Sequence, residues 1–437
     1  MTTIETPWVN RFTALMNLEV IRDRVEVRPE PIPNLGNMAQ LEACERVEKA
    51  LQRVFYPSTQ CLGFLLQWVR IAWAHSLEMY ENHRVFVQGV YQHESPLPEF
   101  CFPWCLTGLA GTGKSALLSA LSRLMPQPST VIASDGTEFP LVSYRAITVR
   151  ACSTPRDILT QFAQREKSAR LLSEFLRRLA YRDGWALVLQ DEFQFATQSE
   201  KASTRVTQMI LAMCYIGVPA IYIANYSLLH KLNARNQEER HRLLGKVKKL
   251  HPDAHTSEDW RILLSWYRDI APDVFTFDPE SDAEAIHILT AGVKRHVASL
   301  LGIGFSLAFS KGGVVDYSVL EKAYQSQGYA TFRDDVEALP KLYGAFRNSR
   351  KDLWCPIDAV VNPSEDVYWQ RQRQTRADNK ALDDSMTVNE RNALAGLSKK
   401  PVASCIKRSE AKVALMRTKK ADAERLRENN SWFSDKL

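Results

Sequence analysis

The sequence predicts an α/β fold in which helices cover both faces of a parallel sheet, and three observations support this prediction. From residue 96 to 280, short apolar runs alternate with amphipathic helical segments, a pattern typical of such sheets. A glycine-rich loop joins one of these runs to a helix. Before residue 96 and after Pro279, apolar residues recur mainly at helix spacing. We therefore expect four parts: a mostly helical region over 1–95, the α/β core over 96–280, a small helical domain over 281–345 and a flexible, basic tail over 346–437.

The short apolar runs of the core are the expected strands. They are Phe102–Leu106, Leu141–Val149, Trp185–Leu189, Ala220–Ala224 and Val274–Phe277. In the N-terminal region, apolar residues three and four apart predict long helices over Met38–Tyr56 and Leu62–Tyr80. After the core, the same spacing predicts helices over 283–290, 293–309 and 318–325.

Composition narrows the class of protein. Of 437 residues, 45% are apolar and 24% are charged, values close to globular averages, which excludes disorder of the whole chain. The longest nearly continuous apolar stretch, Val297–Phe309, is shorter than the roughly 20 residues that cross a bilayer. The first residues carry an acid where an export signal carries basic residues. We expect a cytoplasmic protein with no membrane contact.

The eight cysteines contain no CxxC pair and predict no disulfide framework. Cys101 and Cys105 lie four apart in an apolar run and have no second ligand pair to complete a zinc site, so we interpret them as buried strand residues. Pro252 separates His251 from His255 and argues against a helical pair of ligands. We expect no metal site made by protein ligands alone.

The glycine-rich loop reads Gly108-Leu-Ala-Gly-Thr-Gly-Lys-Ser115 and fits the phosphate-loop pattern G-x-x-x-x-G-K-[ST] at every fixed position. Its glycines let the backbone wrap closely around phosphates with amides pointing inward. Lys114 is expected to reach the β- and γ-phosphates of ATP, and the Ser115 hydroxyl to bind Mg²⁺. The helix Ala116–Met125 presents its positive N-terminal end to the anion. We assign the nucleotide contacts to Gly108, Gly111, Thr112, Gly113, Lys114, Ser115 and Ala116.

An acid pair follows another apolar run. Asp191 and Glu192 come directly after Trp185–Gln190, which places them at the carboxyl end of a strand, where open α/β sheets bind ligands. Asp191 is expected to hold Mg²⁺ and Glu192 to polarise the attacking water. The adjacent glutamate indicates ATP hydrolysis rather than nucleotide binding alone. The alternative is two acids at an exposed strand end.

The strand expected over Ala220–Ala224 ends in Asn225, which would position the attacking water; the alternative is a turn-forming asparagine. This order of phosphate loop, acid pair and polar strand end resembles that of AAA+ ATPases. In that family an arginine of the following region reaches the neighbouring subunit's γ-phosphate, which implies Arg240 or Arg242 here, unless both belong to a solvated helix face. A basic residue of the family's helical lid touches the nucleotide, which implies Lys294 or Arg295.

Within the AAA+ proteins, residues 80 to 345 resemble the regulators of bacterial DNA transposition, TnsC and TniB. The resembling segments are His83–Pro96 before the core, Leu121–Pro126 after the phosphate-loop helix, Asp191-Glu-Phe-Gln194, Gly217-Val-Pro219 and Thr290–Arg295. The resemblance implies a three-layer αβα core, a helical lid over 281–345, and ATP and Mg²⁺ as cofactors.

The resemblance also implies partners. ATP-bound subunits would assemble head to tail, as a ring or a helical filament, on double-stranded DNA. The homo-oligomer would link a target-selecting protein to the transposase, and hydrolysis would disassemble it. Contacts to DNA would be mainly to phosphates. Lys246, Lys248 and Lys249 would face DNA or water. From residue 364 onward, 16 basic residues stand against 11 acidic ones, so the tail is either a tether for the transposase or DNA, or simply solvated.

Two other functions remain open. A helicase loader or replication initiator of the AAA+ type usually carries a winged-helix domain after the lid, and no clear helix-turn-helix pattern follows Gly344. A scaffold that binds ATP without hydrolysing it would not need Glu192, the acid expected to polarise the attacking water. Both observations favour the transposition regulator.

Overall fold

The computed structural model describes residues 6–133, 136–148, 154–163, 169–191, 200–309, 313–339 and 349–357, all within one compact unit, Met1–Asp378. The predicted catalytic Glu192 lies outside the described residues, and so does the predicted tail apart from 349–357. Within the described ranges, no helix is both long and apolar enough to cross a membrane.

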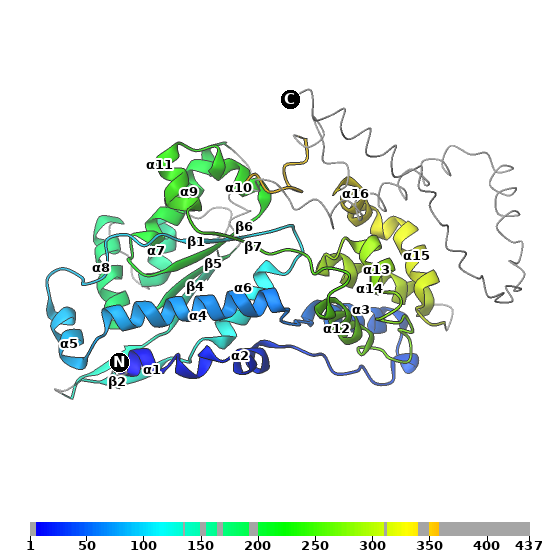
Figure 1. Cartoon of the computed structure of the whole chain (residues 1–437), viewed down its shortest axis with the longest axis horizontal. Helices are drawn as coiled ribbons and strands as arrows, with labels where there is room; N and C mark the ends of the chain where they lie inside the picture. The colour runs from blue at the N-terminus through cyan, green and yellow to red at the C-terminus, as the bar shows by residue number, and fades with distance from the viewer. Residues whose placement is uncertain are drawn as a thin grey trace, which may run out of the picture. The chain divides into compact units, whose positions relative to one another are not determined.

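Among the described residues, five parallel strands form the central sheet, in the order β4-β5-β6-β1-β7 (Figure 1). The strands are β1 (Trp104–Thr107), β4 (Tyr144–Thr148), β5 (Leu187–Asp191), β6 (Ala220–Ala224) and β7 (Val247–Lys249). Thr107 pairs with Ala224, so the chain leaves β1 and β6 side by side. The topology confirms the predicted parallel sheet, and it brings the carboxyl ends of β1, β5 and β6 to one edge.

The prediction was wrong about the fifth strand. Val274–Phe277 does not enter this sheet; Phe275 forms an isolated bridge to Val315 instead. The edge position belongs to β7, whose Val-Lys-Lys sequence is half-buried. An edge strand has a neighbouring strand on one side only, so it tolerates lysines. The prediction searched for apolar runs and therefore missed this strand. The sequence also did not predict the antiparallel hairpin of β2 (Ser129–Ile132) and β3 (Glu138–Leu141) before β4.

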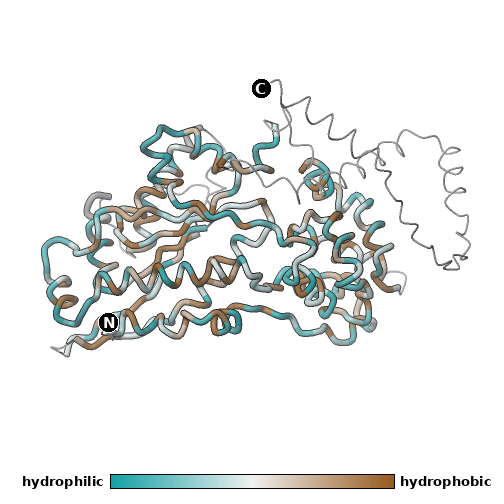
Figure 2. Tube along the Cα trace, viewed as in Figure 1, coloured by the Kyte–Doolittle hydropathy of each residue, from teal (hydrophilic) through white to brown (hydrophobic). Residues whose placement is uncertain are grey.

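Helices cover both faces of the sheet, because alternate strand residues point to opposite sides. Leu106, Leu189 and Ile221 pack with α6 (Lys114–Leu124) in one apolar cluster. Cys105, Val188 and Tyr222 belong to the other cluster, on the opposite face. The helices there are α7 (Pro155–Ala163), α8 (Ala169–Arg182), α9 (Glu200–Cys214), α10 (Tyr226–Asn233) and α11 (Gln237–Leu244). Hydrophobic residues concentrate along the strands, whereas α11 is largely hydrophilic (Figure 2).

The N-terminal helices do not gather around a core of their own. They are α1 (Pro7–Asn10), α2 (Leu18–Val25), α3 (Gln40–Arg53), α4 (Thr59–Met79) and α5 (His83–Tyr91). Helix α4 packs in the same cluster as α6, through residues such as Leu65 and Trp68. Helix α3 instead places Val47 and Leu51 in the apolar cluster of the lid. The N-terminal region is therefore divided between the core and the lid.

In the part of the chain that the structure describes, five helices follow the core and form the lid. They are α12 (Glu258–Arg268), α13 (Ala283–Thr290), α14 (Lys294–Phe309), α15 (Tyr317–Gln325) and α16 (Ala330–Ala338). The sequence prediction placed the residues of α12 in the core, but Trp260 of α12 is buried in the lid cluster. Its indole Nε1 donates to the carbonyl oxygen of Ala283 at 2.9 Å, which joins α12 to α13.

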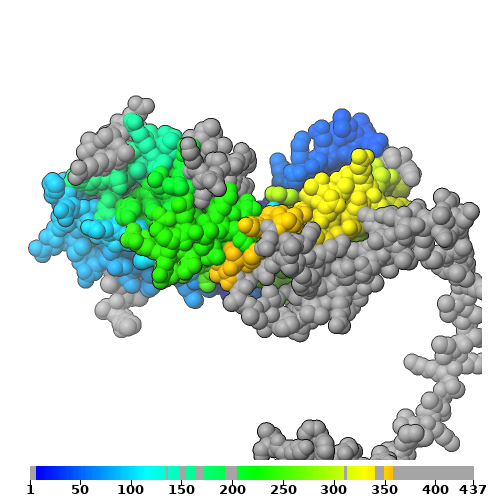
Figure 3. Space-filling model, turned by 90° about the horizontal axis from the view of Figure 1, so that it is seen from above, coloured from blue at the N-terminus to red at the C-terminus, as the bar shows by residue number. Residues whose placement is uncertain are grey.

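Residues 349–357 touch both the core and the lid, and Figure 3 shows them in orange between green core residues and yellow lid residues. Leu353 and Cys355 are buried, and Cys355 belongs to a core cluster. The Trp354 ring lies 4.2 Å from the His230 ring of α10. Arg350 pairs with Asp335 of α16. This part of the predicted tail is therefore packed against the domain.

Candidate nucleotide site

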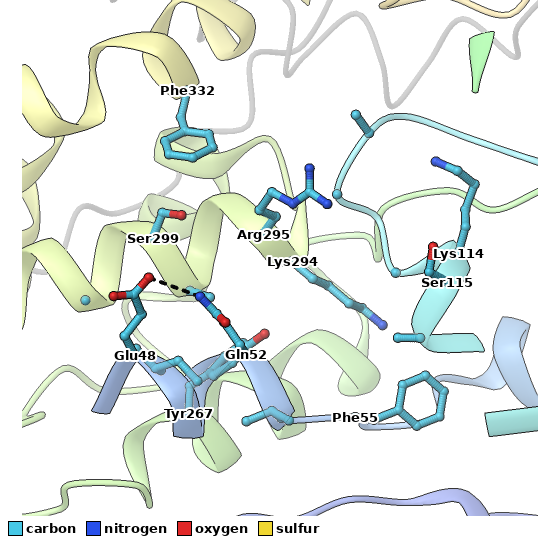
Figure 4. A pocket seen from close by; sticks show the side chains of 18 of the residues that line it. Glu48, Gln52, Phe55, Lys114, Ser115, Tyr267, Lys294, Arg295, Ser299 and Phe332 are labelled. Atoms are coloured by element: carbon cyan, nitrogen blue, oxygen red, sulfur yellow. Dashed lines mark hydrogen bonds between the residues drawn. The ribbon is translucent and has the colours of Figure 1, made fainter. Parts of the chain in front are cut away.

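A cavity of about 1120 Å³ opens between the phosphate loop, the start of α14 and helix α3 (Figure 4). The sites of small ligands and cofactors usually measure roughly 300–1,000 Å³, so a nucleotide has ample room. Of the residues assigned from sequence, the lining includes Gly111, Gly113, Lys114, Ser115, Ala116, Asn225, Lys294 and Arg295. The structure thus brings together residues from three separate parts of the chain.

Two glycines of the loop are required by its backbone. Gly111 has φ +85° and Gly113 has φ +102°, conformations that L side chains rarely adopt. A Cβ atom on Gly111 would also lie 2.7 Å from the Cβ of Arg295. The loop and the first turn of α14 are in direct contact, because the Arg295 amide donates to the Gly111 carbonyl oxygen at 3.1 Å. A larger residue at position 111 would separate the loop from the lid.

Lys114 is a buried cation within the loop. Its side chain is 7% exposed, and its Nζ donates to the carbonyl oxygens of Gly108 at 2.9 Å and Leu109 at 2.6 Å. Burial and, to a smaller extent, the Arg295 guanidinium lower the pKa of Lys114 to about 8, although the Asp191 carboxylate raises it in part. An ammonium group already stripped of water, and held by carbonyl dipoles, is prepared to bind a phosphate.

Asp191 and Ser115 are the residues that would hold a magnesium ion. Asp191 is the last residue of β5 and lies close enough to influence the pKa of Lys114, while the exposed Ser115 lines the cavity. In the described ranges, no three His, Cys, Asp or Glu side chains converge on one point. A hydroxyl and one carboxylate fit Mg²⁺, which takes its remaining ligands from water and substrate phosphates.

Asn225 has two roles available to it. Its Oδ1 accepts a hydrogen bond from the Leu228 amide at 2.9 Å and caps the N-terminus of α10. The residue also lines the cavity. Since the cap occupies the oxygen, the side-chain NH₂ group is the part that remains for a ligand. The helix-capping and water-positioning interpretations are thus compatible.

Lys294 and Arg295, the two lid cations proposed from sequence, both line the cavity at the start of α14 (Figure 4). The Lys294 Nζ lies 3.5 Å from Oδ2 of Asp253. Together with Lys114, these residues place three cations around one cavity. Such a concentration of positive charge fits a polyanion such as a nucleoside triphosphate.

Arg240 and Arg242 do not line this cavity. Both belong to α11, where Arg242 forms an ion pair with Glu238 at 2.9 Å and stacks on the ring of Phe100. Nearby, the ammonium groups of Lys246 and Lys248 lie 5.4 Å and 5.5 Å from the ring of Trp104. Neither arginine is thus at the nucleotide cavity of its own chain.

The sequence prediction missed the contribution of the N-terminal region. Glu48 and Gln52 of α3 and Phe55 after it line the cavity, and the Gln52 Nε2 donates to Glu48 Oε1 at 3.1 Å (Figure 4). Tyr267 of α12 lines it as well. One signal was available: Glu48 and Gln52 are four apart, beside the apolar stripe of their helix, and so share one polar face.

The comparisons with known proteins found little similarity. No family model matches the chain, and no curated protein matches it. Solved structures with a partly similar arrangement include the Orc1 protein of Aeropyrum pernix in complex with DNA. This match covers 68% of this chain and 72% of that chain, at 16% sequence identity and a TM-score of 0.38. The match to Cdc6p of Pyrobaculum aerophilum covers 75% of this chain and 76% of that chain. The sequence identity is 16% and the TM-score is 0.36. Similarity this weak says nothing about what the chain binds.

The fold class follows from the chain's own strand order and from the elements attached to the strands. The phosphate loop follows β1, and Asp191 ends β5. Strand β6, which lies between β1 and β5 in the sheet, is followed by Asn225. The helical lid contacts the phosphate loop at the start of α14. Parallel strands in the order β4-β5-β6-β1-β7 with these attachments form the predicted three-layer α/β fold with a phosphate-binding loop and a helical lid.

Proposed function

We propose that the chain is an ATP-dependent regulator of DNA transposition, which assembles on target DNA and links a target-selecting protein to the transposase. The observation that carries the ATP-dependent part is the convergence of Lys114, Lys294 and Arg295 on one cavity next to Asp191. The transposition part rests on the resemblance of residues 80–345 to the TnsC and TniB regulators.

Each residue of the site has a distinct task in this proposal. Lys114 leaves the loop carbonyls to bind the β- and γ-phosphates, and Arg295 neutralises charge from the lid side. Ser115 and Asp191 would hold Mg²⁺, which would supply further charge neutralisation at the phosphates. The Asn225 NH₂ group orients the attacking water, and Glu192 accepts its proton.

The assembly in this proposal is head to tail, because the resemblance implies that an arginine of a neighbouring subunit completes each site. Arg240 and Arg242 do not line their own cavity, which is compatible with the proposal that one of these α11 arginines acts at the cavity of a neighbouring copy. Lys246 and Lys248, on an edge of the sheet, contact DNA phosphates. Hydrolysis of ATP removes the charge that joins neighbours and disassembles the oligomer.

Electron microscopy with duplex DNA and a slowly hydrolysed ATP analogue tests this proposal. We expect rings or filaments of the wild-type protein and none of Lys114→Ala, because the lysine is needed to bind ATP. Glu192→Gln should assemble with ATP itself and hydrolyse it about 100-fold more slowly, because the base is lost. The exposed Lys322→Ala is the matched control and should behave as wild type.

Discrete monomers of wild-type protein on DNA would contradict the regulator proposal, and unchanged hydrolysis by Glu192→Gln would contradict the assignment of the base. Purified transposase distinguishes this function from a helicase loader: we expect the DNA-bound assembly to retain the transposase, and the ADP-bound protein to release it.

A further inference from the structure

Asp253 lies in the segment that joins the last core strand to the lid. The segment starts at Leu250, whose amide donates to the Thr107 carbonyl oxygen of β1 at 2.8 Å, and ends where α12 begins. Asp253 touches the lid twice. Its carboxylate faces the Lys294 ammonium at 3.5 Å, and its carbonyl oxygen lies 3.1 Å from Nε2 of His287 in α13. This residue therefore connects the core, the lid and the nucleotide cavity.

The ion pair between Asp253 and Lys294 is buried and loose. The two side chains are 8% and 18% exposed, and the contact is an ion pair without a hydrogen bond, because Oδ2 of Asp253 has no donor within the described ranges. Taking both charges out of water costs free energy that only well-formed hydrogen bonds offset. A stronger anion can therefore take the lysine from this aspartate.

Lys294 is within reach of such an anion. Its Cδ lies 3.6 Å from the position that a Cβ atom on Gly113 would occupy, so the side chain runs along the phosphate loop. In the view of Figure 4 the side chain extends between Phe55 and Ser115. Rotation about its terminal bonds moves the ammonium between Asp253 and the loop, where Lys114 already marks the phosphate position.

We propose that Asp253 is a positioning residue that holds Lys294 in the nucleotide-free protein and loses it to the triphosphate when ATP binds. This inference rests on the proposed ATP site. Once Lys294 turns to the phosphates, Asp253 is a buried carboxylate without its counter-ion, which is an unfavourable state. The segment over 250–257 then moves to hydrate it, and the contact with His287 carries this movement to the lid.

Replacement of the aspartate by its uncharged isostere tests the exchange. Asp253→Asn leaves Lys294 free, so we expect it to bind ATP about tenfold more tightly than wild type, with a smaller gain for ADP, which lacks the γ-phosphate. In a Lys294→Met background the same substitution should change ATP affinity by less than about twofold. Glu258→Gln, an exposed carboxylate at the start of α12, is the matched control and should have no effect.

Hydrogen exchange of the wild-type protein gives a second readout, for which Lys294→Met is the control. We expect ATP to increase exchange over 250–257 in wild type but not in Lys294→Met. Unchanged or weaker ATP binding by Asp253→Asn, additive effects of the two substitutions, or no change in exchange would each overturn the proposal while wild-type ATP binding remained. Wild-type protein that failed to bind ATP would overturn the proposed function itself.

Discussion

Lys114 shows how a single side chain sets the chemistry of the cavity. Its ammonium is buried beside Arg295, so its charged form is held less strongly than that of a lysine in water, and its pKa is lowered to about 8. A bound triphosphate favours the charged form and raises this pKa again. ATP binding above about pH 8 must therefore take up a proton.

We predict that ATP affinity is nearly constant from about pH 7 to about pH 8 and falls as pH rises further, because the free protein then loses the proton that the complex keeps. Titrations with a fluorescent ATP analogue measure this directly. In Lys114→Arg the charge persists throughout this range, so any remaining affinity should not change with pH. A wild-type affinity that stayed flat to about pH 9.5 would show that Lys114 keeps its ordinary pKa.

Among the elements, α10 links the sheet to the cavity through its cap. Asn225 gives its carbonyl oxygen to the helix and keeps its NH₂ group for the ligand. Two substitutions separate these roles, because aspartate is as good an N-cap as asparagine but has no NH₂ group.

We expect Asn225→Asp to keep the thermal stability of wild type and to lower ATP hydrolysis about tenfold or more, because a donor to the attacking water is lost. Asn225→Ala should lose the same activity and, in addition, about 1 kcal/mol of stability with the cap. Thermal melts and single-turnover assays make the comparison. Hydrolysis by Asn225→Asp at the wild-type rate would leave capping as the role of this residue.

Another element, β7, carries the charge that is proposed to meet DNA. Its lysines, Lys248 and Lys249, are compatible with a strand because β7 forms the edge of the sheet. Trp104 of β1 orients Lys248 and Lys246, which directly precedes β7. Contact with the indole already restricts the conformations of these lysine side chains in the free protein. Less conformational entropy is therefore lost when their ammonium groups contact phosphates.

At the scale of the whole molecule, DNA affinity should depend steeply on salt, because phosphate contacts release counter-ions. We predict that the combined Lys246→Ala and Lys248→Ala substitutions lower the slope of log affinity against log salt by about two per protomer, since each lysine meets about one phosphate. The exposed pair Lys322→Ala and Lys351→Ala serves as the control. An unchanged slope would place the DNA on another face of the protein.

The architecture of the whole chain also bears on how nucleotide state spreads. Helix α3 packs in the lid cluster and lines the cavity, while α4, a few residues later, packs beneath the sheet. Residues 349–357 contact α10 on one side and α16 on the other. A change in the angle of the lid would therefore displace helix α3 and residues 349–357, because both contact the lid.

The sequence by itself determined the parallel sheet and the phosphate loop. Short apolar runs, glycines at fixed spacing and the Lys-Ser pair are local patterns, and a buried strand or a phosphate cradle demands those residue types wherever it occurs. Asn225 was singled out because it follows a strand, and Lys294 and Arg295 because of the resemblance to AAA+ lids; all three line the cavity.

Tertiary structure alone decided the rest. No local pattern indicates that β7 is a strand, that Glu48 and Gln52 face the nucleotide cavity, or that Asp253 pairs with Lys294. These features depend on contacts between residues far apart in the chain, and the same lysines, glutamates and aspartates would be compatible with an exposed helix or loop. Burial and proximity gave those ordinary polar residues their roles.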